Sequence, residues 1–263
     1  MDRAAVTFGS RLRQWRAQRG LTQLALALSA DVSARHLSWL EGGKAEPSRA
    51  MVLRLCERLE VPLRERNAML VAAGYAPMYG ERGDDPAAQR AMQALQRLLD
   101  AHAPWPALAV DRHWNLVAHN ATVPLLLRMA APELLVPPVN VLRVSLHPKG
   151  LAPMIGNLAA WHAHAVHRVQ RQLGATGDPA SARLLDELRA LRPPGSDTLH
   201  DEPALDDVAV TLVLNTPLGR LTFITTITVF GAPHDVRLSE IAVETLLPAD
   251  EATADALRGL VVG

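Results

Sequence analysis

Residues 21–44 read "LTQLALALSADVSARHLSWLEGGK", and this stretch decides the fold of the first part of the chain. Thr22 and Ser33 are of the residue types that cap the first turn of a helix, and Gly42-Gly43 is well suited to end one. The sequence therefore predicts two short helices, "QLALALSA" and "ARHLSWLE", separated by only three or four residues. Two helices joined by so short a turn are typical of a helix-turn-helix, although a protein-interaction module is an alternative.

The residues on either side of this pair extend the helical pattern. The first helix has apolar residues at helical spacing, Phe8, Leu12 and Trp15, and Gly20 stops it. A fourth helix, "RAMVLRLCERL", follows the capping Ser48, and a fifth covers residues 63–73. We therefore predict an all-α N-terminal domain of about five helices over residues 1–75.

The charge of the chain is unevenly distributed along its length. The 27 Lys and Arg residues balance the 27 Asp and Glu residues, so the formal net charge is zero. Residues 1–80, however, hold 12 basic against 7 acidic residues, and residues 81–263 hold 15 against 20. A basic N-terminal part suits contact with double-stranded DNA, because neutralised phosphates release counterions and thereby increase affinity.

Composition excludes several other classes of protein. A hydrophobic fraction of 49% is ordinary for a folded domain, and no apolar run approaches the roughly 18 to 20 residues of a membrane span. The N-terminus lacks the apolar segment of a secretion signal. The single Cys56 excludes an internal disulfide and a cysteine-rich zinc site. These observations favour a cytoplasmic protein that does not bind membranes.

The remainder of the chain changes in character. Residues 76–100 are predicted to be a linker and a connecting helix, and residues 101–263 a second domain. "ALAV" and "NLVAH" flank a polar turn, as do "VAVTLVLNT" and "RLTFITTITVF", and a further strand is expected in "RLSEIAVETLL". Helices are expected in "ATVPLLLRMA", "KGLAPMIGNLAAWHAHAVHRVQRQL", "DPASARLLDELRAL" and after Asp250, and "PELLVPPVNVLRVSLHP" is expected to be irregular. Two strands, helices and three strands predict an α+β domain, a five-stranded antiparallel sheet with helices on one face, similar to a PAS domain.

The pattern "LTQ…LA…A…VS…LSWLEGGK…PS" resembles the XRE family of phage-repressor-type regulators. The resemblance implies sequence-specific DNA binding, with Arg35, Ser38 and Trp39 over bases. It implies backbone or phosphate contacts from the remaining candidates, which are Thr22, Gln23, Ser33, His36, Lys44 and Arg49. Arg16 and Glu41 match positions that form an intramolecular pair. Asp31 replaces the usual glycine of the turn, and aspartate tolerates the left-handed conformation better than most residues.

The second domain resembles the MmyB-like transcription regulators through "PWPALAVDRHWNLVAHN" and "NVLRVSLHPKGLAPMIGNLAAW". The matching residues are Asp111, Trp114, Asn120, His147, Pro148, Asn157 and Trp161. The resemblance implies a PAS-like second domain whose apolar pocket holds a small apolar, fatty-acid-like ligand. We also expect a homodimer and no obligatory cofactor. The candidate ligand-binding residues are Leu126, Met129, Val139, Met154, Trp161 and Val229.

Two rival functions are open for the second domain. It could be a closed module that only dimerises, or a metal or haem sensor that uses His162, His164 or His167. We assign no metal ligands, because His162 does not share a helical face with the other two and no Cys, Asp or Glu completes the set. The sequence holds no nucleophile elbow, glycine-rich phosphate loop or HExxH pattern, so we do not expect an enzyme.

Overall fold

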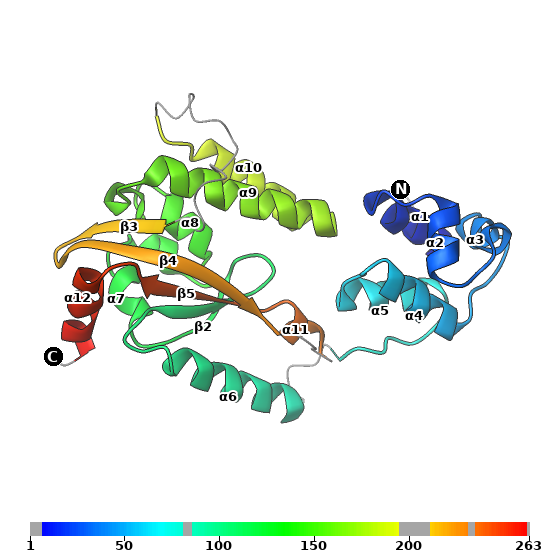
Figure 1. Ribbon diagram of the computed structural model, residues 1–263, viewed down its shortest axis with the longest axis horizontal. Coiled ribbons are helices and arrows are strands. Elements are labelled where there is room, and N and C mark those ends of the chain that lie inside the picture. The colour runs from blue at the N-terminus through cyan, green and yellow to red at the C-terminus, as the bar shows by residue number, and fades with distance from the viewer. Residues whose placement is uncertain (1–6, 81–85, 195–210, 231–234, 262–263) are drawn as a thin grey trace. The chain divides into compact units, whose positions relative to one another are not determined.

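The computed structural model describes residues 7–80, 86–194, 211–230 and 235–261 (Figure 1). Part of the predicted linker and the first residues of the strand expected from Val208 lie outside the described residues. The chain forms two compact units. One contains the residues up to Arg82 together with Ala232–Ser239, and the other contains Gly83–Gly231 and Glu240–Gly263.

The N-terminal unit contains the five predicted helices, which are α1 (Phe8–Gln18), α2 (Gln23–Ser29), α3 (Ala34–Glu41), α4 (Arg49–Arg58) and α5 (Leu63–Ala72). The three predicted caps are present. Thr22 Oγ1 accepts from the N–H of Ala25 at 3.1 Å, Ser33 Oγ from His36 at 3.1 Å and Ser48 Oγ from Met51 at 3.2 Å. Asp31 has a φ of 53°, which confirms the left-handed turn between α2 and α3.

The core of this unit is built from α1 to α5, and leucines are prominent in it, among them Leu12, Leu26, Leu37, Leu40 and Leu55, none more than 1% exposed. Gly9 allows α1 to approach the end of α3. A Cβ atom at Gly9 would lie 2.5 Å from the carbonyl oxygen of Leu40 and 2.7 Å from that of Glu41. No side chain larger than a hydrogen atom fits there without a shift of the backbone.

A short helix from late in the sequence, α11 (Val236–Ser239), belongs to the same unit. Val236 is fully buried, and its N–H donates to the Gly80 carbonyl at 3.0 Å. The prediction of a strand starting near Arg237 was wrong for these residues. Asp235 Oδ1 accepts from the N–H groups of Arg237 and Leu238, which favours a helical turn here.

The C-terminal unit is built on the five-stranded antiparallel sheet that the sequence predicts. Its strands are β1 (Ala107–Val110), β2 (Leu116–His119), β3 (Thr211–Thr216), β4 (Gly219–Val229) and β5 (Ala242–Pro248). Their order across the sheet is β2-β1-β5-β4-β3, with antiparallel pairing throughout. The last strand therefore lies in the centre, and its side chains reach the middle of the domain core.

Helices complete this unit: α6 (Pro86–Asp100), α7 (Val123–Leu127), α8 (Val141–Leu146), α9 (Leu158–Thr176), α10 (Pro179–Ala190) and α12 (Glu251–Val261). The α9 and α10 helices lie on one side of the sheet, and α6 lies on the other (Figure 1). α6 contacts β1 and β2, and its Leu95 and Leu99 are buried.

Two local predictions in the middle of this unit require correction. The segment expected to be irregular contains α8, because Asn140 Oδ1 accepts from the N–H of Arg143 at 3.0 Å and starts a helical turn. The helix expected from Lys149 begins only at Leu158. The intervening residues form a tight turn at Gly150 and a 3₁₀ helix, Ala152–Met154, instead.

Candidate DNA-binding surface and ligand cavity

The exposed face of α3 presents the residues predicted to contact bases. Arg35, Ser38 and Trp39 lie at positions i, i+3 and i+4, so they share one face of the helix, and all three are exposed. Leu37 and Leu40 are fully buried on the other face. The Arg35 guanidinium lies 4.6 Å from the centre of the Trp39 ring. Trp39 therefore stays at the surface, and a cation–π contact positions the arginine.

The other predicted DNA contacts border this helix in sequence. Thr22 and Gln23 begin α2, Ser33 caps α3, Lys44 lies in the turn after α3, and Arg49 begins α4. Thr22, Ser33, Lys44 and Arg49 are exposed, whereas Gln23 and His36 are half-buried. The arrangement is that of a helix-turn-helix whose second helix exposes one face.

Glu41 at the end of α3 connects this surface to α1. Its side chain is fully buried and accepts from Arg16 at two points, Nε to Oε1 at 2.6 Å and Nη2 to Oε2 at 3.0 Å. This confirms the predicted intramolecular pair. Gln23 Nε2 also donates to Oε2 at 2.8 Å. Burial by itself raises the pKa of Glu41, but the hydrogen bonds from Arg16 and Gln23 outweigh it and hold that pKa below its ordinary value.

The C-terminal unit contains an apolar cavity of about 80 Å³. Its aliphatic lining comes from β1, α7, α8, β3, β5 and the loop after α8: Leu108, Val123, Leu126, Leu127, Val141, Leu142, Val144, Leu151, Leu212 and Leu246. Trp161, Ser145 and Glu244 complete the wall. Of the six predicted ligand-binding residues, Leu126 and Trp161 line this cavity. Met129, Val139 and Met154 pack against the same core without lining it, and Val229 is 64% exposed.

Glu244 is the charged residue of this wall, and sequence reasoning missed it. It is only 5% exposed and accepts from Arg168 Nη1 of α9 at 3.0 Å. The Arg168 guanidinium lies 4.3 Å from the centre of the Trp114 ring. The available signal was a single acidic residue in the apolar run "AVETLL", at a position where the alternation of β5 faces the core.

The three histidines of α9 lie in different environments. His162 is buried, and its Nε2 lies 2.7 Å from the Leu188 carbonyl, so this nitrogen carries the proton. His164 stacks on Trp161, and burial, together with Arg168 and Arg171, lowers the pKa of His164 to about 4. His167 is exposed. Within the described residues, no group of three or more His, Cys, Asp or Glu side chains is arranged to hold a metal ion.

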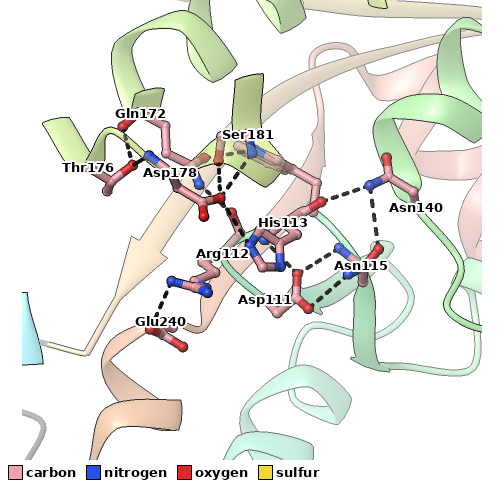
Figure 2. Close-up of polar contacts among 11 residues, drawn as sticks. Asp111, Arg112, His113, Asn115, Asn140, Gln172, Thr176, Asp178, Ser181 and Glu240 are labelled. Atoms are coloured by element: carbon pink, nitrogen blue, oxygen red, sulfur yellow. Dashed lines mark hydrogen bonds and ion pairs between the residues drawn. The ribbon is translucent and has the colours of Figure 1, made fainter. Parts of the chain in front are cut away.

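Polar contacts connect the turn between β1 and β2 to the helices that cover the sheet (Figure 2). Asp111 Oδ1 accepts from the N–H groups of His113 and Asn115 at 2.7 and 2.9 Å. His113 Nε2 lies 3.1 Å from Oδ2 of Asp178, the cap of α10, and Asn140 Nδ2 donates to the His113 carbonyl at 2.7 Å. The turn therefore fixes the starts of α8 and α10 relative to the sheet.

Other residues of the resemblance also hold the walls in place. Asn120 Nδ2 donates to the Trp105 carbonyl at 2.8 Å, and its Oδ1 accepts from the N–H of Ala107. Asn157 bridges the start of α9 to β3 through the carbonyl of Thr211 and the N–H of Val213. Trp114 Nε1 donates to Gln172 Oε1 of α9 at 3.0 Å, whereas Trp161 lines the cavity itself.

A family model, the MmyB-like transcription regulator ligand binding domain, matches residues 91–260. The chain belongs to the MmyB-like transcription regulators. A second model, a helix-turn-helix domain, matches residues 7–69. This MmyB-like protein is therefore a DNA-binding transcription regulator with a ligand-binding domain, as the sequence predicts.

The remaining comparisons add little. No curated protein matches the chain significantly. A solved structure described as "Structure of an RNA-binding Light-Oxygen-Voltage Receptor" is 14% identical, with a TM-score of 0.27. The match covers 96% of this chain and 63% of that protein, so this chain spans less than two thirds of its length. Among the described residues, no helix is both long and apolar enough to cross a membrane.

Proposed function

We propose that this MmyB-like regulator is a cytoplasmic, homodimeric transcription factor of the XRE type, and that a small apolar ligand controls its binding to specific DNA sequences. The observation that supports ligand control is the cavity, whose wall is aliphatic apart from Trp161, Ser145 and Glu244. A closed module that only dimerises has no need of such a space. The proposal assigns the protein no catalytic step and no obligatory cofactor.

In this proposal, two sets of residues share the work of DNA binding. Thr22, Gln23, Lys44 and Arg49 contact phosphates and set the register, with support from Ser33 and His36. Arg35, Ser38 and Trp39 then contact base edges, and Arg35 is best suited to a bidentate contact with guanine. The cation–π contact with Trp39 supports this role, because it orients the Arg35 guanidinium before DNA arrives.

The size of the cavity implies that its walls move when a ligand binds. A cavity of about 150 Å³ holds benzene, so the 80 Å³ described here is too small for a fatty-acid-like chain. Binding such a chain requires the cavity walls to move apart, and that movement can be passed to the DNA-binding units of a dimer. The ligand shifts DNA affinity only as far as its own affinity differs between the two states of the protein.

The test combines native mass spectrometry of the purified full-length protein with extraction of its bound small molecules. We expect a stoichiometric apolar molecule on the wild type and on Leu218→Trp, whose side chain lies in an exposed turn. Leu126→Trp fills the cavity and is expected to lose the molecule. A bare wild type, together with DNA affinity that no apolar extract changes, would contradict ligand control and leave the dimerisation module as the better explanation.

A further inference from the structure

We infer that the cavity selects an uncharged ligand with a hydroxyl-type group at its polar end, and that Glu244 and Arg168 recognise this group. The inference rests on the proposed function, since it concerns the ligand of the same cavity. It narrows that ligand from any apolar molecule to a neutral amphiphile, and it argues against the anion of a fatty acid.

Glu244 is the polar group of the wall that is available to a ligand. The other polar residue, Ser145, already donates its hydroxyl to the Leu142 carbonyl at 2.9 Å and accepts from Trp161 Nε1 at 3.4 Å. Glu244 lies on the central strand β5, opposite Leu108 of β1 and Ile227 of β4. A carboxylate among aliphatic side chains accepts hydrogen bonds, so it favours a ligand that brings a donor.

Arg168 holds this carboxylate and is itself incompletely satisfied. Its side chain is 5% exposed, and only Nη1 donates to Glu244. Among the residues that the structure describes, the buried Nε and Nη2 atoms have no hydrogen-bond partner. Buried donors without partners cost free energy, and this cost is removed when an acceptor reaches them. Arg168 lies behind Glu244 and is not part of the cavity wall. An oxygen beside Glu244 can therefore donate its proton to the carboxylate, and it can accept from the guanidinium when the walls move apart.

Charge balance decides which kind of oxygen fits. Glu244 and Arg168 together are neutral, so a neutral ligand leaves the cavity neutral. A fatty-acid anion could accept from the guanidinium, but it would place a second negative charge beside Glu244, so the buried site would carry a net negative charge. An ether or alkane avoids that cost but brings no donor for Glu244. A hydroxyl meets both requirements.

Three probes that share an eight-carbon chain separate these cases: octan-1-ol, octanoate and octyl methyl ether. Each is titrated as a competitor of the neutral fluorescent probe N-phenyl-1-naphthylamine on the full-length protein at about pH 7.5, where octanoate is ionised. We expect octan-1-ol to bind at least tenfold more tightly than either competitor, which corresponds to about 1.4 kcal/mol. Octanoate or the ether binding as tightly as the alcohol would overturn the inference and leave the proposed function standing. Failure of all three to bind would count against both.

Variants of Glu244 and Arg168 test whether these two residues cause the preference for the alcohol. Glu244→Gln is expected to reduce the preference for alcohol over octanoate to below about threefold, whereas Glu251→Gln, on the exposed face of α12, is expected to leave it unchanged. Because Glu244→Gln leaves Arg168 without a counter-charge, the double variant Glu244→Gln/Arg168→Gln provides a second test without a buried charge. An alcohol preference that survives in a folded double variant would show that the pair does not recognise the ligand.

Discussion

Glu41→Gln should destabilise the N-terminal unit more than any exposed charge substitution. The Glu41 side chain is fully buried and accepts from Arg16 twice and from Gln23 once. Two unit charges about 4 Å apart attract by about 4 kcal/mol at an effective dielectric constant of 20. Removing one partner of a buried pair costs about 3–5 kcal/mol, and Arg16 retains 15% exposure, so we expect a loss of about 2–4 kcal/mol.

Cys56 provides the assay. It is the single cysteine of the chain and is fully buried in the N-terminal core, and burial raises the pKa of its thiol to about 12. A disulfide reagent such as Ellman's reagent therefore reacts only after this unit opens. A loss of 2–4 kcal/mol should accelerate labelling by roughly 30- to 700-fold. The exposed Glu46→Gln serves as the matched control and should label at the wild-type rate.

Cys56 labelling should be measured near pH 8, where Glu41 contributes its full stabilisation to the N-terminal unit. The folded pKa of Glu41 lies below its ordinary value, so its stabilisation is present above the unfolded pKa of about 4.3 and is lost as pH falls through the folded pKa. A Glu41→Gln protein that labels within threefold of the wild type would refute the reasoning and would mean that solvent screens the pair.

Three further predictions concern the N-terminal unit. Gly9→Ala should cost about 1–3 kcal/mol, because the new Cβ would press on the carbonyls at the end of α3, and Cys56 labelling measures this loss. Arg35→Ala should weaken binding to a selected DNA site by about 1–3 kcal/mol and leave random DNA affected far less, as fluorescence anisotropy of both DNAs would show. Lys44→Ala should weaken binding to both DNAs alike and lower the slope of log affinity against log salt by about 1, in a salt titration; a selective loss would contradict a phosphate contact.

Local signals made the helices and strands of this protein predictable. Thr22, Ser33 and Ser48 each cap a helix by accepting from the residue three positions ahead, so both partners of the bond stand close together in the sequence. The left-handed Asp31 is likewise set by the residue and its neighbours. Asn140 and Asp235 accept the same kind of local hydrogen bond from a backbone N–H. Both bonds were overlooked in the sequence, and the predictions for the helices that they start were wrong.

The sequence by itself determined the helix-turn-helix and the five strands, because alternation and capping are properties of neighbouring residues. Only the tertiary structure decided which residues surround the cavity. Glu244 meets Arg168 across 76 residues, and α11 joins the N-terminal unit from the far end of the chain. Core and cavity walls use the same apolar residue types, so composition could not separate Leu126, which lines the cavity, from the exposed Val229. That difference arises from how distant elements pack, which neither periodicity nor spacing encodes.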